Sequence, residues 1–275
     1  MRALRVGITL IGIGAVCGVA CGGADGGAED LKPGGGNGFD VDAGGDGSGG
    51  GGLDGAVGDG AGIADTGNRC GKTLTGVIRD FKEEHPDFEY KIGDDLGIVQ
   101  EDLGADGKPV WAGGTHPTVT TKESFDQWFR DVPGVNQAIA LPITLSKVAG
   151  ELHTFDDGAF FPIDGKGFGN EGHEHNFHFT YELHTTFLYA GGETFKFTGD
   201  DDLFVFINKK LAIDLGGVHG STSGEVALDD AAGKLGLTKG KVYALDFFFA
   251  ERHTSESHFR IDTTLDFVSC GDGIK

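Results

Sequence analysis

Basic residues are scarce in this sequence. It holds 22 Lys and Arg against 43 Asp and Glu, which gives a formal net charge of -21 over 275 residues. No extended run of Lys or Arg occurs outside the N-terminal tip. A chain this acidic repels phosphate backbones, so we expect no nucleic-acid partner. An acidic surface instead suits divalent cations.

The common catalytic sequence motifs are also missing. The sequence contains no Gly-x-Ser-x-Gly elbow, no phosphate-binding P-loop and no dinucleotide-binding glycine fingerprint. We therefore predict that the protein is not an enzyme.

Long apolar runs are absent too. The run from Val6 to Ala20 is shorter than the roughly 20 residues that cross a bilayer. Arg2 and Arg5 precede it, which is the layout of a secretory signal. Cys21 follows Ala20 directly and resembles the lipidated cysteine of a bacterial lipobox, although Gly18 stands where that motif usually has Leu. Residues 1–21 are thus predicted to be a signal peptide with a lipobox-like end, and ordinary cleavage near Ala20 is the alternative.

This signal predicts an exported protein. Lipidation of Cys21 would anchor it to a membrane of the cell envelope or at the cell surface. Release into the medium as a secreted protein is the alternative destination.

Cysteine is scarce, with four residues in the whole chain. Apart from Cys21, the cysteines beyond the signal are Cys70 and Cys270, which bracket the region with apolar content. In an oxidising compartment we expect these two to form a disulfide bond that joins the first and last strands. Two unrelated free thiols are the alternative.

Glycine, in contrast, is abundant and unevenly placed. Of the 51 glycines, 20 lie between Gly22 and Gly67, in a stretch rich in Asp and almost free of aromatic residues. Such a segment has too little apolar content to fold. Residues 22–67 are therefore predicted to be a disordered, solvated tether.

Residues 68–275 carry the pattern of a mostly β domain. From Phe177 to Tyr189, apolar residues occupy odd positions and polar residues occupy even positions, as in a strand with one apolar face. Further strands are predicted over 194–198, 203–207, 210–215, 242–250 and 259–267. The runs Phe204–Ile207 and Phe247–Ala250 are continuously apolar, which indicates strands covered on both faces and two packed sheets. One clear helix is predicted over Glu123–Arg130, capped by Thr120 or Thr121 and packed over one end of the sandwich.

Three adjacent carboxylates, Asp200, Asp201 and Asp202, lie between two apolar strands. Adjacent like charges repel, so a tight turn with three of them needs a cation or several backbone N–H groups. Calcium is the natural candidate, because it takes six to eight oxygen ligands. Glu251, in the polar loop after the last long apolar run, could complete the site or pair with Arg252. A solvated hairpin tip is the alternative for the aspartates.

Histidines gather just before and within the clearest strand. His173, His175 and His178 are candidates for a transition-metal site. His178 and His184 share one strand face, however, whereas His173 and His175 precede the strand in a glycine-rich loop. The alternative is a polar strand face with histidines in ordinary hydrogen bonds.

Several ordered motifs carry a family resemblance over Thr73–Phe267. They are Phe160-Phe161-Pro162-Ile163-Asp164-Gly165, Asn176-Phe177-His178-Phe179-Thr180, Gly199-Asp200-Asp201-Asp202, Asp214-Leu215-Gly216-Gly217-Val218-His219 and Phe248-Phe249-Ala250-Glu251-Arg252-His253. With them the chain resembles a fibro-slime domain, a family similar to the protective-antigen-type β-sandwich of yeast flocculins. The resemblance implies a two-sheet antiparallel β-sandwich with one or two short helices.

The resemblance also implies a site. In flocculin-like lectins, two consecutive aspartates joined by a cis peptide coordinate calcium, which in turn binds sugar hydroxyls. Their counterparts here are Asp200 and Asp201, and Asp202 stands where the family often has Gly. The expected function is calcium-dependent binding of extracellular polysaccharide or cell-surface glycans in adhesion or matrix formation. A structural matrix component without a ligand site and a His-metal enzyme acting on carbohydrate are the alternatives.

Overall fold

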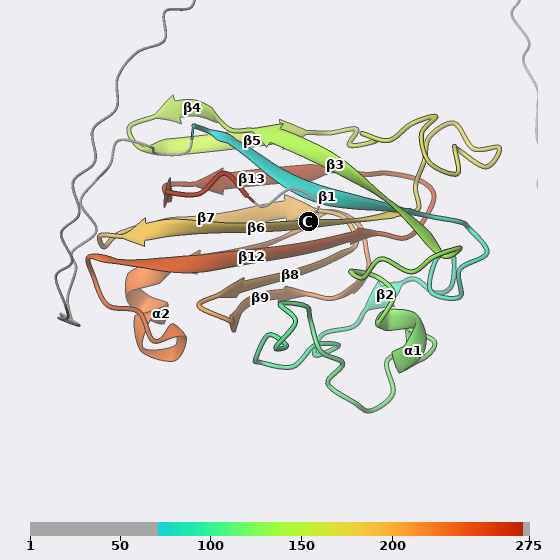
Figure 1. Cartoon of the computed structure of the whole chain (residues 1–275), viewed down its shortest axis with the longest axis horizontal. Coiled ribbons are helices and arrows are strands. Elements are labelled where there is room, and N and C mark those ends of the chain that lie inside the picture. The colour runs from blue at the N-terminus through green and yellow to red at the C-terminus, as the bar shows by residue number, and fades with distance from the viewer. Residues whose placement is uncertain (1–70, 272–275) are drawn as a thin grey trace, which may run out of the picture. The chain divides into compact units, whose positions relative to one another are not determined.

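The predicted strands form two antiparallel sheets in a computed structural model that describes residues 71–271 (Figure 1). The larger sheet has the order β3-β1-β6-β12-β8-β9, and β14 pairs with β6; the smaller sheet has the order β11-β7-β13-β5-β4. The strands of the larger sheet are β1 (Thr73–Phe81), β3 (Asn136–Thr144), β6 (Phe179–Tyr189), β8 (Asp202–Ile207), β9 (Lys210–Leu215), β12 (Lys241–Glu251) and β14 (Asp266–Phe267). Those of the smaller sheet are β4 (Ser146–Ala149), β5 (Leu152–Asp157), β7 (Thr194–Gly199), β11 (Thr222–Ala227) and β13 (Phe259–Thr263). A short pair, β2 (Gly93–Asp94) with β10 (Gly217–Val218), stands apart. The predicted antiparallel β-sandwich is confirmed.

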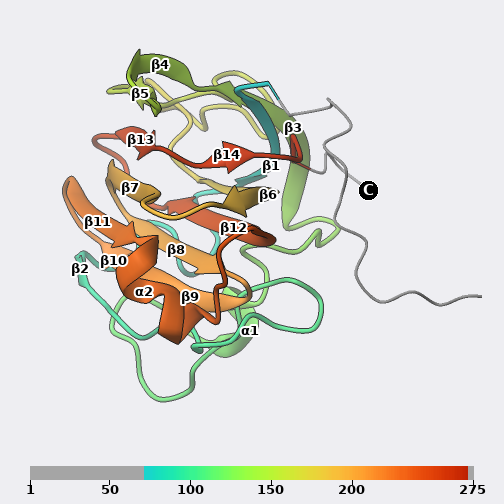
Figure 2. The same cartoon turned by 90° about the vertical axis from the view of Figure 1, so that its left-hand side faces the viewer.

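The main core lies between the two sheets, which Figure 2 shows as separate layers. The odd positions of β6 face this core, and Phe179, Tyr181 and Phe187 are fully buried there. Phe247 and Phe249 of β12 join them from the neighbouring strand. The alternation predicted for β6 is confirmed, because every second side chain of a strand lies on the same face.

A third layer covers the outer face of the larger sheet. Phe125, Trp128 and Phe129, from the segment between β1 and β3, form a second core with the outward side chains of β8 and β12. The rings of Phe129 and Phe248 lie 5.0 Å apart in an edge-to-face contact. Strands β8 and β12 are therefore covered on both faces, as their continuous apolar runs predicted.

The helix of this layer is shorter than predicted and lies elsewhere. Helix α1 spans Lys122–Phe125, with a capping box between Thr121 and Ser124. It packs under the outer face of the sheet, and not over an end of the sandwich, because its aromatic residues meet the outward face of β12. The regular helix stops early because the following bonds tighten to the i→i−3 type: Gln127 N donates to Ser124 O and Trp128 N donates to Phe125 O. Side chains from elsewhere satisfy the carbonyls after it: Asn136 Nδ2 donates to Gln127 O and Arg130 O, and Thr180 Oγ1 donates to Trp128 O.

The second helix, α2, spans Leu228–Leu235 and ends at Gly236 with a positive φ of 66°. It faces the viewer in Figure 2 and closes one end of the sandwich. No helix within residues 71–271 has the length and apolar character needed to span a membrane.

The opposite end of the sandwich gathers the longer connections. The loop from β5 to β6, the turn from β7 to β8 and the loop from β12 to β13 all lie there, at the right of Figure 1. The predicted strand over 259–267 breaks between Thr263 and Asp266, so that β13 joins the smaller sheet and β14 the larger one. The positions Cys21, Cys70 and 22–67 lie outside the described residues. Cys270 is among the described residues, and its carbonyl accepts a hydrogen bond of 2.8 Å from Thr75 N, beside the start of β1.

Candidate functional site

The three aspartates form the turn between β7 and β8, and backbone N–H groups meet them from two neighbouring loops. Asp200 Oδ2 accepts a hydrogen bond of 2.9 Å from His258 N, and Asp201 Oδ1 accepts one of 3.2 Å from His219 N. Asp201 has a positive φ of 51°, a conformation that only a few per cent of residues other than glycine adopt. Residues 71–271 contain no cis peptide bond, so the Asp200–Asp201 peptide is trans, unlike the pair in the lectins.

Asp202 has a different environment from the other two. Its Oδ2 lies 2.6 Å from Arg252 Nε, and its Oδ1 accepts a hydrogen bond of 2.7 Å from Gly217 N. Both of its oxygens therefore already have strong donors. The structure places Asp202 in a buried ion pair.

Arg252 connects this turn to the outer layer. Its Nη1 donates to Asp87 O and Thr118 O at 3.0 and 2.7 Å, and its guanidinium lies 4.5 Å from the centre of the Trp128 ring. Its backbone N–H donates to Asp201 Oδ2 at 2.8 Å. One residue thus fixes both Asp201 and Asp202. Arg252 pairs with Asp202 and not with Glu251, so that alternative reading of the loop is wrong.

Glu251 is the last residue of β12. Its side chain lies on the opposite face from that of Arg252, between the sheets. It is 1% exposed, and neither of its carboxylate oxygens has a hydrogen-bond partner in the structure. Asp200 Oδ1 and Ser257 Oγ are likewise buried and unpartnered. Among residues 71–271, four buried side-chain polar atoms have no hydrogen-bond partner. All four are oxygens, and all belong to this end of the sandwich.

The carboxyl groups at this end of the sandwich have raised pKa values, because they are buried without enough positive charge nearby. Burial raises the pKa of Asp201 to about 7, even though Arg252 opposes the rise. Burial raises the pKa of Glu251 well above its ordinary value, and the charge of Asp201 adds to the effect. Burial also raises the pKa of Asp200. Such a group of carboxylates is stabilised by whatever brings positive charge.

The residues present suit a hard cation in their chemistry. Carboxylate and hydroxyl oxygens are the donors that calcium prefers, and Asp200, Glu251 and Ser257 offer such oxygens buried and without partners. No three His, Cys, Asp or Glu side chains in the described part of the chain are already drawn together as a metal cluster. Backbone carbonyls, which calcium also uses, would have to complete the ligand set.

Two cavities flank Asp200. The larger, of about 510 Å3, extends along Phe161, His175 and Ser257, and the smaller, of about 110 Å3, lies toward Asp201 and His219. Asp200, Ser255 and Glu256 line both cavities. A ligand held at the aspartates can therefore continue into a groove.

The histidines predicted as an alternative metal site are only partly brought together. The rings of His173 and His178 meet edge to face at 5.7 Å, while His175 stacks on Phe161 at 4.0 Å and pairs with Asp164. His178 is buried, and its Nε2 lies 3.1 Å from Glu89 Oε1. The structure thus separates His175 from the other two and gives each ring a carboxylate or aromatic partner.

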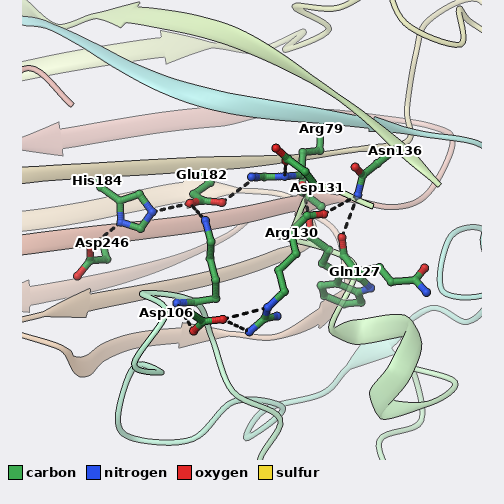
Figure 3. A network of polar contacts seen from close by, with 12 residues as sticks. Arg79, Asp106, Gln127, Arg130, Asp131, Asn136, Glu182, His184 and Asp246 are labelled. Atoms are coloured by element: carbon green, nitrogen blue, oxygen red, sulfur yellow. Dashed lines mark hydrogen bonds and ion pairs between the residues drawn. The ribbon is translucent and has the colours of Figure 1, made fainter. Parts of the chain in front are cut away.

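A second polar network, drawn in Figure 3, includes His184 on the outer face of β6. His184 lies between Asp246 and Glu182, at 2.6 and 2.5 Å, and Glu182 also receives Arg79 Nη1 at 2.7 Å and Lys108 Nζ. Burial raises the pKa of Glu182, but its cationic partners outweigh this and lower it to about 2. This network ties the third layer to the sheet.

Sequence reasoning missed several residues at the groove. Ser257 and His258 were part of a polar loop with no assigned role, and His219 and Phe161 belonged only to family motifs. Their positions depend on which loops meet at one end of the sandwich. No local pattern carries that information.

Comparison with known proteins gives a family match for part of the chain. The PA14 domain model matches residues 156–274, which in the described part runs from β5 to β14. The chain is 44% identical over 213 residues to protein psiD of Dictyostelium discoideum, covering 71% of this chain and 42% of psiD. It is 43% identical over 190 residues to protein psiQ of the same organism, covering 64% of this chain and 19% of psiQ. The chain thus spans less than half the length of these curated relatives.

Solved structures give weaker matches. The PA14 sugar-binding domain from an RTX adhesin is 9% identical, with 73% of this chain and 95% of that chain covered and a TM-score of 0.31. The PA14 domain of the antifreeze protein MpAFP is also 9% identical, with 68% and 80% covered and a TM-score of 0.28.

Proposed function

We propose that this chain is a calcium-dependent carbohydrate-binding module of the adhesin type. The observation that carries the proposal is the set of four buried, unpartnered oxygens at one end of the sandwich. Burying such atoms costs free energy unless something satisfies them. The match to the PA14 domain, a carbohydrate-binding and adhesin-type module, supports a sugar as the ligand and a binding module over an enzyme.

In this proposal Asp200, Asp201 and Glu251 hold the cation, and Ser257 lies beside them. When bound, calcium would supply Lewis-acidic coordination for sugar hydroxyls. Asp202 positions the turn without being a ligand, because its charge is already neutralised by the buried ion pair with Arg252. The groove beside Asp200 receives the rest of the glycan.

We also propose that the protein acts outside the cell. The predicted signal and Cys21 favour a lipid-anchored protein of the envelope or surface, and a disulfide between Cys70 and Cys270 suits that compartment. The proposed partners are therefore an extracellular glycan and a membrane.

Calcium titration of the full chain tests the metal. At about 100 times the dissociation constant, mass action predicts roughly 2.7 kcal/mol of stabilisation, which thermal melting detects. Glu251→Gln, which keeps the shape and removes the charge, should abolish most of this gain and change the melting temperature little in chelator. The control is Glu225→Gln on β11. Equal melting temperatures in calcium and in chelator would defeat the site and favour a purely structural component.

A glycan array with and without chelator tests the sugar. The expected result is binding in calcium that chelator removes. Binding that survives chelator would separate the carbohydrate function from the proposed metal. An absence of binding in both conditions would contradict the carbohydrate function itself.

A further inference from the structure

The larger cavity at Asp200 has two walls of different chemistry. One wall is aromatic and comes from the loop between β5 and β6. The other is polar and comes from the loop between β12 and β13, with Asp200 at the junction. Both loops lie at the same end of the sandwich in Figure 1.

The aromatic wall is flat and rigidly held. The rings of Phe161 and His175 stack with centroids 4.0 Å apart and an interplanar angle of 4°. Phe177 meets Phe161 edge to face at 5.0 Å, and Asp164 Oδ2 lies 2.7 Å from His175 Nδ1. A fixed ring pair of this kind offers apolar area against which the C–H face of a sugar ring can pack without loss of side-chain freedom.

Each of the two loops also contributes an acidic side chain. Glu174 and Glu256 are exposed carboxylates of the groove, and neither carboxylate has a hydrogen bond or ion pair with another described residue. No Lys or Arg lines either cavity. The histidines of the groove bring little net positive charge, because His175 lies against Asp164 and His258 lies 3.4 Å from Asp156.

Buried acceptors add to this wall. Asp200 and Ser257 are 4% and 2% exposed, and Asp200 Oδ1 and Ser257 Oγ have no partner. These two residues line the same cavity as the two exposed carboxylates and the aromatic pair. Asp200 is a cation ligand in the proposed function, whereas Ser257 Oγ remains available to the glycan and would be satisfied by an N–H or O–H donor of the occupant.

We propose that the groove selects a glycan that contains amino sugars with free amino groups, and that it rejects uronic acids. This inference rests on the proposed carbohydrate-binding function and names the class of its ligand. A sugar ring packs on Phe161 and His175, and its ammonium group lies between Glu174 and Glu256. A carboxylate of a uronic acid in the same place would meet two negative charges, and no Lys or Arg lines the cavity to offset them.

Calorimetry of the full chain in calcium tests the selectivity. The probes are β-1,4-linked oligomers of equal length made of glucosamine, glucose or mannuronic acid. We expect a dissociation constant for the glucosamine oligomer that is about tenfold or more below that for glucose, and the weakest binding for mannuronate. Equal affinity for glucosamine and glucose, or tightest binding of mannuronate, would overturn the inference and leave a calcium-dependent carbohydrate module standing. Failure of every oligomer and of the glycan array would defeat both proposals.

Variants connect the selectivity to the groove. Glu174→Gln and Glu256→Gln should each move the ratio of the glucose and glucosamine dissociation constants several-fold toward unity, since each removes one charge and keeps the side-chain shape. Phe161→Ala should weaken both oligomers. Glu151→Gln, in the β4–β5 turn at the other end of the sandwich, is the matched control and should leave the ratio unchanged. An unaltered ratio in both groove variants would contradict the assignment of the ammonium site.

Discussion

Arg252 Nε lies 2.6 Å from Asp202 Oδ2, and neither side chain has any exposed surface. The pair joins the turn of the candidate site to the outer layer, because the same guanidinium also donates to the carbonyls of Asp87 and Thr118. Removing one partner of a buried ion pair leaves an uncompensated charge in a medium that solvates it poorly.

Arg252→Met should therefore destabilise the fold by about 3 to 5 kcal/mol, measured as a lower midpoint in urea. The matched control is Arg260→Met. Arg260 pairs with Asp262 and Asp156 at a partly exposed position, where a loss below about 1 kcal/mol is expected. The double variant Arg252→Met with Asp202→Leu should recover part of the stability, because no buried charge is left alone. Equal losses for Arg252→Met and Arg260→Met would contradict the central position of the buried pair.

Trp128 supports the same pair from the outer layer. It is fully buried, its Nε1 donates to Asp87 Oδ2 at 2.9 Å, and its ring packs on Phe125 at 5.0 Å. Trp128→Ala should cost about 3 to 5 kcal/mol in the free energy of unfolding, because it opens a large cavity and removes the donor to Asp87 Oδ2. Trp111, the other tryptophan, is only partly buried, so Trp111→Ala should cost less. A larger loss of stability for Trp111→Ala than for Trp128→Ala in urea denaturation would contradict the central position of Trp128.

The network around His184 predicts the pH dependence of stability. Burial lowers the pKa of His184, but hydrogen bonds to Asp246 and Glu182 outweigh it and raise the pKa from 6.5 to about 9. The stabilisation of the fold by protonated His184 is therefore complete below pH 6.5 and is lost as the pH rises through about 9. Glu182 has its pKa lowered from 4.5 to about 2, so its stabilisation is complete above pH 4.5 and is lost as the pH falls through about 2.

His184→Gln tests the predicted loss of stability at alkaline pH. Glutamine does not titrate, so the variant should be less stable than the parent at neutral pH, by on the order of 2 kcal/mol, and should converge with it at high pH. Urea midpoints across the pH range measure both curves. His153→Gln is the control, because His153 Nδ1 pairs with the carbonyl of Glu151 and not with a carboxylate. Parallel curves for His184→Gln and the parent would contradict the prediction.

The strand period accounts for most of what the sequence predicted. In β12, Phe247, Phe249 and Glu251 alternate with Phe248 and Ala250, and Arg252 follows directly after the strand. The two sets face different cores, which follows from the two-residue period alone. The same period separates Glu251 from Arg252 and could have excluded their pairing.

Contacts distant in the sequence account for what could not be predicted. Asn136 and Thr180, at other places in the chain, bind the carbonyls that follow the short helix α1 and hold that segment in a non-helical path. Asp202 differs from Asp200 because Arg252 lies across the sheet from it, 50 residues away in sequence. Such tertiary contacts leave no trace in a local pattern, so the position of the aspartates was predictable and their separate environments were not.

The lipid anchor at Cys21 is a prediction from the leader alone. Cys21→Ser should move the protein from the membrane fraction to the soluble fraction, because a serine at this position cannot be lipidated. Fractionation of cells followed by immunoblotting measures this. Cys70→Ser is the control and should leave the distribution unchanged. A Cys21→Ser variant that stays with membranes would contradict the anchor while leaving export open.

The last prediction is the disulfide between Cys70 and Cys270. The hydrogen bond from Thr75 N to Cys270 O places the chain end beside the start of β1, only a few residues after position 70. A bond there would close nearly the whole domain into one loop. Chain-entropy arguments give such a loop about 5 kcal/mol of stabilisation, and engineered bonds often give less.

Peptide mapping without reductant should recover the two cysteines in one linked peptide from protein isolated from its own compartment. Cys270→Ser should lower the melting temperature, and reductant should lower that of the parent to a similar value while leaving the variant unchanged. Cys21→Ser is the matched control, because it removes a thiol outside the predicted bond. Free thiols at both positions in the isolated protein would contradict the pairing.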